Sequence, residues 1–248
     1  MNRILDILKE NNPYIAIYDL FKSGELKNIF PELYNLYTED RGYKNNFIHT
    51  LGVLENVCEF NNDFKLKIVA LLHDIGKTQT KKNSPNGWTF HNHESVGANM
   101  STNILDKWDV SDYLKNYVYR MVYYHGRTKL HRDITDSAIR RLDNEVGQDI
   151  IFDLIDFCKC DITTKFQNKR QRIHDSLDVI KQRIIEVRKM DEDSKWKSPL
   201  TGFIIMDLLG IEQGKLIGDI KKELDPKLKS GEIDLDYAIN YIKKLYKK

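Results

Sequence analysis

Apolar residues recur along most of the chain at spacings of three and four positions, which is typical of helices with one buried face. Residues 30–33 indicate a turn into a further helix, with Pro31 at its first position. Strand-like alternation is nearly absent, so the sequence predicts an all-α fold. The pattern predicts helices at about 4–8, 15–21, 47–60, 64–75, 93–108, 112–125, 137–145, 149–160 and 165–189.

One segment, Thr78–Asn92, interrupts this helical pattern. Ser84-Pro85-Asn86-Gly87 is typical of a turn, and Trp88-Thr89-Phe90 fits a short extended piece. Near the other end, the polar run Asp191–Lys195 predicts a linker that ends at Pro199. Shorter helices are expected beyond it, at 202–209, 213–224 and 236–248. We therefore expect a helical core domain over 1–190 and a small helical appendage over 191–248.

Composition is that of an ordinary globular protein. Of the 248 residues, 41% are hydrophobic and 31% are charged, and the net charge is +2, so no strong global field attracts nucleic acid or anionic lipid. The longest apolar runs are too short to cross a bilayer, and we expect no secretory signal at the N-terminus, which carries an acidic residue early. Cys58, Cys158 and Cys160 form no C-x-x-C pair, which fits a reducing cytoplasm. Cys158 and Cys160 are interpreted as small buried helix residues rather than a redox or metal pair.

The candidate chemistry is carried by histidines and aspartates that follow one another in an ordered series. Imidazoles and carboxylates on separate helices suit one or two borderline divalent metal ions, and such a site can make water nucleophilic at neutral pH. The series therefore indicates a metal-dependent hydrolase. Its members are His49, His73, Asp74, His93, His125 and Asp161.

Each member also has an ordinary explanation when it is taken alone. His125 continues the apolar stripe of its helix, as a hydrogen-bonded core histidine would. Asp161 continues the stripe of helix 149–160, where a carboxylate is costly unless it is paired, capped or metal-bound. His49 and His93 near helix starts could be capping or surface residues. Their joint occurrence near helix ends favours a metal site.

The string Leu71-Leu72-His73-Asp74-Ile75-Gly76-Lys77 is the most specific part of the series. It offers one nitrogen and two carboxylate oxygens at a single point, where the carboxylate can bridge two metal ions. Lys77 would neutralise phosphate charge beside the metal, or would be a solvated lysine at the helix end. Of the other histidines, His91 could face the site mouth, His131 could contact substrate from a polar loop, and His174 is expected to be solvated.

These strings resemble the HD superfamily of metal-dependent phosphohydrolases, and in particular the HD-bearing C-terminal region of bacterial CCA-adding tRNA nucleotidyltransferases and poly(A) polymerases. The resemblance runs from about Leu20 to the C-terminus. Beside Leu72–Lys77, it is carried by His49-Thr50-Leu51, Gly87–Glu94, Thr135–Arg141, Cys160-Asp161-Ile162-Thr163, Ile205-Met206 and Gly214–Gly218.

The resemblance implies an all-α HD core in which His49, His73, Asp74 and Asp161 hold one metal ion. His93 and His125, with Asp74 bridging, would suit a second ion. Related HD regions hydrolyse phosphomonoesters and 2′,3′-cyclic phosphates, and the ion would be Mn²⁺, Ni²⁺, Co²⁺, Fe²⁺, Zn²⁺ or Mg²⁺.

The chain departs from this family pattern at two points. We expect no nucleotidyltransferase head, because no Gly-rich strand-turn with paired aspartates precedes Leu20. Relatives often carry a His-Lys-Asp-like string before the first metal histidine, whereas this chain has Tyr43-Lys44-Asn45-Asn46. A substrate contact by that string is therefore not expected here.

The sequence supports two hypotheses of different kinds. In the first, the metal site hydrolyses a nucleotide, a cyclic phosphate or an RNA-end phosphate, with Asp74, His93 and His125 at the reacting phosphate. Lys77 with Arg140 or Arg141 would add positive charge there, although both arginines could equally be helix-surface charges. In the second, the basic helix 165–189 and the lysine-rich tail contact tRNA or another RNA beside a separate nucleotidyltransferase subunit. No membrane contact is expected, and an oligomer is compatible with the sequence.

Overall fold

The computed structural model describes residues 2–37, 45–85, 87–128 and 134–246. The chain divides into two compact units, Met1–Val187 and Arg188–Lys248, each with its own hydrophobic cluster. Fifteen α-helices, one 3₁₀ helix and a two-stranded hairpin make up the described part, so the predicted all-α fold is confirmed. None of the described helices combines the length and the apolar character that a membrane span needs.

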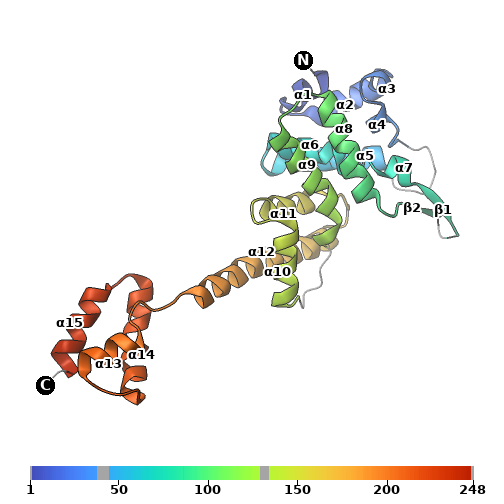
Figure 1. The fold of residues 1–248 in the computed structure, drawn as a ribbon. Helices are drawn as coiled ribbons and strands as arrows, with labels where there is room; N and C mark the ends of the chain where they lie inside the picture. Colours follow the sequence, from blue (N-terminus) through green and yellow to red (C-terminus); the bar gives the residue numbers. More distant parts are fainter. Residues whose placement is uncertain (1, 38–44, 86, 129–133, 247–248) are drawn as a thin grey trace. The chain divides into compact units, whose positions relative to one another are not determined.

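The first unit begins with four short helices (Figure 1). Pro13 does not merely stop the first helix but begins the second, where its missing N–H costs nothing. Buried Lys67 ties this region to the core, because its Nζ donates to the carbonyls of Leu8 and Glu10, both at 3.0 Å. The four helices are α1 (Arg3–Leu8), α2 (Pro13–Lys22), α3 (Leu26–Ile29) and α4 (Pro31–Tyr34).

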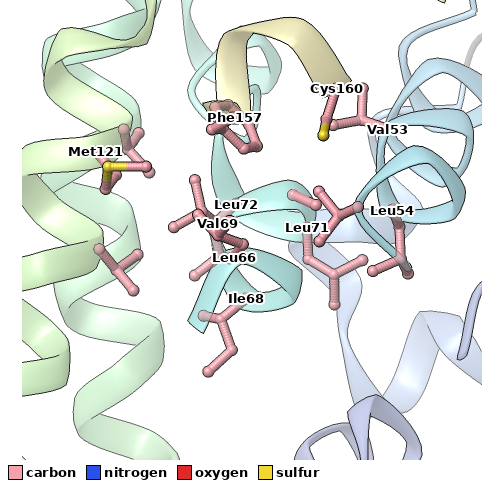
Figure 2. Packing of buried hydrophobic residues seen from close by; sticks show 14 of the residues in the cluster. Val53, Leu54, Leu66, Ile68, Val69, Leu71, Leu72, Met121, Phe157 and Cys160 are labelled. Atoms are coloured by element: carbon pink, nitrogen blue, oxygen red, sulfur yellow. The ribbon is translucent and has the colours of Figure 1, made fainter. Parts of the chain in front are cut away.

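The centre of the unit is α6 (Phe64–Leu72), which packs against α5 (Asn46–Phe60), α9 (Asp112–Tyr124) and α11 (Ile151–Cys160). Every residue of α6 from Leu66 to Leu72 is buried, as expected for a helix surrounded by others. Figure 2 shows Val53 and Leu54 of α5, Met121 of α9 and Phe157 of α11 around it. The helix ends at Leu72, so His73 and Asp74 follow the helix rather than forming its last turn.

The interrupted segment contains a short helix and a hairpin. The helix α7 (Lys77–Thr80) was not predicted. The extended piece is confirmed as strand β2 (Gly87–Thr89), which pairs antiparallel with β1 (Lys82–Ser84), and Asn86 of the expected turn lies outside the described residues. The chain then enters α8 (His93–Lys107), which packs along α9. A 3₁₀ turn, η1 (His125–Thr128), follows α9.

The last helices of the first unit are α10 (Asp136–Val146), α11 and the start of α12 (Gln167–Lys195). The buried stripe of α12 is short and consists of Leu177, Ile180, Ile184 and Val187. The predicted polar linker at Asp191–Lys195 is wrong, because α12 continues through it. No glycine or proline interrupts that run, and Asp193 is held by an ion pair of 2.8 Å with Lys229.

The second unit contains α13 (Gly202–Leu209), α14 (Lys215–Ser230) and α15 (Leu235–Tyr246). Its core is small and includes Leu200, Ile205, Ile220 and Ile242. The helix α14 extends past the expected end at residue 224 and contains Pro226, and Gly231 closes it in the left-handed conformation (φ 73°). The three helices thus bury one apolar face each in a core of their own.

Candidate metal centre

All six residues of the predicted ligand series come together in the first unit. His49 lies in the first turns of α5, and His73 and Asp74 follow α6 directly. His93 begins α8, His125 follows α9, and Asp161 follows α11. Because these helix ends converge, ligand atoms from three residues lie within 4.8 Å of one another in each of two groups, His49-His73-Asp74 and Asp74-His93-His125.

Asp161 extends the first group. Its Oδ1 lies 2.9 Å from Nε2 of His49 and 3.5 Å from Nε2 of His73. The Oδ2 atom of Asp74 lies 3.6 Å and 3.3 Å from the same two nitrogens. Two imidazoles and two carboxylates therefore converge on one point.

The other carboxylate oxygen of Asp74 faces the second group. Its Oδ1 lies 3.5 Å from Nε2 of His93 and 3.9 Å from Nε2 of His125. Each oxygen of Asp74 thus serves a different histidine pair. This is the arrangement that a carboxylate bridging two cations requires.

Hydrogen bonds at the far nitrogen orient the histidines toward the centre. Nδ1 of His73, His93 and His125 lies 2.9, 2.9 and 2.6 Å from the main-chain carbonyls of Ala70, Phe90 and Val122, three residues earlier in each case. A carbonyl only accepts, so Nδ1 carries the proton. The Nε2 lone pair of each neutral ring is then directed into the cluster, as a metal ligand requires.

Two buried polar atoms in the cluster have no aligned hydrogen-bond partner, Nε2 of His73 and Oδ1 of Asp161. The short approach of His49 to Asp161 lacks the alignment of a hydrogen bond. Leaving such groups unsatisfied is costly in a protein interior. A cation held between them would satisfy both, so the donor set fits a divalent metal ion.

The charges of the cluster also favour a cation. Burial would raise the pKa of both aspartates. His73 and then Lys77 hold the pKa of Asp74 well below its usual range, whereas the close approach of His49 and then of His73 lowers the pKa of Asp161. Burial opposes charge on His73, yet the two carboxylates outweigh it and raise its pKa to about 10. Burial, and then the charge of His73, lower the pKa of His125 to about 4. The carboxylates thus stabilise one positive charge beside His73, whether a proton or a metal ion supplies it.

Lys77 lies beside the cluster and is bound to it. Its Nζ donates to Oδ2 of Asp74 at 2.6 Å, and the side chain is mostly buried. Lys77 is therefore not a solvated lysine at a helix end. It contributes positive charge to the same carboxylate oxygen that faces His49 and His73.

Close backbone contact between two glycines places the second histidine group. A Cβ atom on Gly76 would lie 2.2 Å from the carbonyl oxygen of His93 and 2.5 Å from the nitrogen of Gly97. Gly76 has φ −64°, so it is required for this close approach and not for a left-handed helix cap. The turn after Asp74 can therefore lie directly against the first turns of α8, which carry His93.

The remaining predicted residues are less closely connected with the cluster. Arg140 is half-buried and Arg141 is exposed on α10, and neither takes part in the ion pairs that Asp74 and Asp161 make with described residues. His91 is exposed. His174 is half-buried rather than solvated, and its Nε2 lies 3.2 Å from the carbonyl of Lys159.

Four residues singled out in the sequence lie at or beyond the edge of the described residues. His131, Tyr43 and Lys44 lie outside them. Asn45, from the string that departs from the family pattern, caps α5 by accepting from the N–H of Ile48 at 3.2 Å. Cys158 and Cys160 are buried in α11 and form no disulfide among the described residues, as expected of small buried helix residues.

The sequence analysis did not identify two residues that contact the candidate ligands. The Thr163 hydroxyl lies 2.9 Å from Nδ1 of His49, and Oε2 of Glu94 lies 3.2 Å from Nδ1 of His93. Both stand within two positions of a ligand, which was the available indication. Only the fold shows that Thr163 serves a histidine 114 residues away.

The comparisons with known proteins agree with this geometry. Residues 46–164, which contain all six ligand positions, match the family model described as HD domain. This region of the chain is therefore similar to HD domains. The same region is similar to a region of multifunctional CCA proteins, and its His/Asp cluster is compatible with binding a divalent metal ion.

Three such relatives define the extent of the similarity. The multifunctional CCA protein of Mannheimia succiniciproducens is 28% identical over 150 residues, which is 56% of this chain and 35% of the relative. The protein of that name from Methylococcus capsulatus is 25% identical over 146 residues, with shares of 56% and 34%. The one from Teredinibacter turnerae is 28% identical over 136 residues, with shares of 50% and 31%. The matched segment therefore spans about a third of each relative's length.

Proposed function

We propose that the protein is a metal-dependent phosphohydrolase that cleaves a phosphate ester of a nucleotide, a 2′,3′-cyclic phosphate or an RNA end. The observation that carries this proposal is Asp74, whose two carboxylate oxygens face two separate histidine pairs. One or two divalent ions, chosen among Mn²⁺, Ni²⁺, Co²⁺, Fe²⁺, Zn²⁺ and Mg²⁺, would supply Lewis acidity and lower the pKa of a water molecule.

In this proposal each residue has a definite task. His49, His73 and Asp161 would hold one ion, His93 and His125 would hold a second, and Asp74 would contribute to both sites. The backbone carbonyls behind three of the histidines keep Nε2 directed inward during turnover. Lys77 keeps Asp74 ionised and adds positive charge near the phosphate. Arg140 and Arg141 are proposed to add positive charge on the outer side of the phosphate.

A second candidate function is an RNA-binding half that works with a separate nucleotidyltransferase subunit in the cytoplasm. Two observations favour it, the name of the relatives and the exposed basic residues at the start of α12. The ordered ligand cluster favours the hydrolase, because RNA binding alone does not need buried carboxylates beside four inward-facing histidines.

The test is a screen of hydrolysis by metal-stripped protein. It combines Mn²⁺, Ni²⁺, Co²⁺, Mg²⁺ and Zn²⁺ with p-nitrophenyl phosphate, bis-p-nitrophenyl phosphate, AMP and 2′,3′-cyclic AMP. We expect turnover only after metal is added, and a loss of more than about a hundredfold in Asp74→Asn, since even an outer partner of a ligand is worth about 10–100-fold. Asp149→Asn is the matched control, because this exposed carboxylate pairs with Arg120 outside the cluster.

The outcomes separate the two candidates. Metal-dependent turnover that is lost in Asp74→Asn and kept in Asp149→Asn supports the hydrolase. Turnover that survives Asp74→Asn excludes the assigned site. RNA binding without turnover for any metal supports the second candidate.

A further inference from the structure

Eight consecutive residues after the candidate ligand Asp161 form an exposed cationic surface. Residues 165–172, here named the 165–172 segment, are all exposed and include no acidic residue. Among the described residues, no carboxylate forms an ion pair with the segment's basic side chains. Its cations are Lys165, Lys169, Arg170 and Arg172.

The rest of α12 differs from this segment. Lys181 is bound by Asp156 at 2.9 Å, and Arg183 is bound by Asp136 and Glu186. Their charge is therefore neutralised within the protein. Unlike these two residues, the four cations of the 165–172 segment are exposed and have no acidic residue within the segment.

Two aromatic rings accompany these cations. Large aromatic side chains are usually mostly buried, yet Phe166 is 65% exposed and Phe60 is 50% exposed. A hollow of about 650 Å³ lies beside Phe166 and is also lined by Lys165, Lys169 and Arg172. A second hollow of about 310 Å³ is lined by Phe60, Arg170 and His174. Cations and exposed rings therefore share two hollows that flank one stretch of helix.

The surface lies close to the candidate metal centre along the chain. Phe166 is five residues from Asp161, so their Cα atoms are at most about 18 Å apart. Thr163, which contacts His49, lies between them. Asn56 donates to the carbonyl of Cys160 at 2.7 Å and lines the same hollow as Phe60.

We propose that this surface binds a single-stranded nucleic acid whose end enters the metal centre. The bases stack on Phe166 and Phe60, and the phosphates contact the four cations of the 165–172 segment. The inference rests on the proposed function only in naming the strand's end as the substrate. It makes the substrate a polynucleotide end, because a free nucleotide at the metal centre would leave this surface unused.

Binding is measured by fluorescence anisotropy with a labelled 12-residue oligoadenylate RNA and metal-stripped full-length protein, so that no turnover intervenes. We expect Phe166→Ala to weaken binding roughly tenfold, the order of one lost base stack. The double variant Lys169→Gln/Arg172→Gln should weaken it further and make the slope of log K against log salt shallower by about 1.4, the value for two lost phosphate contacts to a single strand.

Two matched controls should bind as the wild type does. Phe203→Ala removes a ring that is 75% exposed in the second unit. Lys22→Gln/Lys27→Gln removes two exposed lysines of α2 and α3. A loss equal to that of the test variants in either control would overturn the assignment to the 165–172 segment.

Two further binding measurements distinguish a nucleic-acid strand from other anionic ligands. Single-stranded DNA of the same sequence tests whether the surface needs ribose, and either result keeps a nucleic-acid strand as the ligand. A labelled polyglutamate peptide that binds as tightly as RNA, with Phe166→Ala neutral for both, would overturn the proposal and leave a general anion surface.

This result is independent of the hydrolysis screen. Phe166→Ala should keep wild-type turnover of bis-p-nitrophenyl phosphate while it loses RNA affinity. If the wild type lacks turnover but the variants lose RNA binding, the surface stands and the phosphohydrolase fails. If turnover is present and RNA affinity does not change in the variants, the surface fails and the phosphohydrolase stands.

Discussion

Thr163 shows how a residue outside the candidate ligand set can orient one of its members. Its hydroxyl is the partner of Nδ1 of His49 and thus restrains the rotation of that ring. A methyl group of the same side chain lies 3.3 Å from the Cβ position of Gly52, so α5 and the segment after α11 are in close contact here. The position of His49 depends on this contact.

We therefore expect Thr163→Val to weaken metal binding by about 10–100-fold with little change in unfolding temperature, because valine keeps the shape but not the hydroxyl. Isothermal titration with Mn²⁺ measures the affinity. Thr50→Val is the control, since its buried hydroxyl on the same helix has no partner among the described residues. Equal affinities in both variants would show that His49 is oriented by other contacts.

At the same scale, the sequence identified all six residues of the cluster but not what orients them. Coordination chemistry determines which residue types can bind a divalent metal ion, and the sequence shows directly where these residues occur. The carbonyls of Ala70, Phe90 and Val122 are invisible in a sequence, because every residue has one. The sequence also left open whether Lys77 contacts the cluster or is solvated, because the side-chain rotamer of Lys77 determines its ion pair with Asp74.

Among the elements, the contact of α8 with the turn after Asp74 is the one that joins the two histidine groups. Gly76 and Gly97 approach so closely that a Cβ on either would meet the backbone of the other, at 2.5 Å and 3.2 Å from its nitrogen. The contact places His93, the first residue of α8, near Oδ1 of Asp74. If a side chain at Gly76 forced α8 away from this turn, His93 would move away from Asp74 together with the helix.

Gly76→Ala should consequently destabilise the protein by about 1–3 kcal/mol, the usual cost of overpacking, and lower metal stoichiometry or affinity. Denaturant unfolding and metal titration measure the two effects. In Gly218→Ala the new methyl group meets nothing within 4 Å, and alanine is the better helix former by about 1 kcal/mol, so this control should be neutral or stabilising. A Gly76→Ala protein as stable as the wild type would contradict the close approach.

Element boundaries were predicted well where apolar periodicity is strong and poorly where it fades. The ends of α5 and α8 fall within one residue of expectation. The polar run 191–195 was mistaken for a linker because it lacks an apolar stripe, although its residues sustain a helix. The turn Lys77–Thr80 was missed since one helical turn is too short to show a period.

At the scale of the whole molecule, the two units have separate cores. The cluster of the first unit extends from Ile4 to Val187, and that of the second from Leu200 to Ile242. The candidate metal centre depends only on residues of the first unit. The second unit is small, and small cores leave little margin of stability.

Ile242→Ala is thus expected to unfold the second unit locally without affecting metal binding. Ile242 is fully buried, and truncation of such a residue costs about 2–5 kcal/mol, a large share of what a core of this size supplies. Hydrogen exchange resolved by residue should show lost protection over 202–246 and unchanged protection in α5, α6 and α8. Leu71→Ala, in the core of the first unit, should give the reverse pattern and weaken metal binding, because Leu71 precedes His73 by two residues. If Ile242→Ala lowered protection equally in both units, the two cores would form one cooperative unit, and the metal centre would depend on the whole chain.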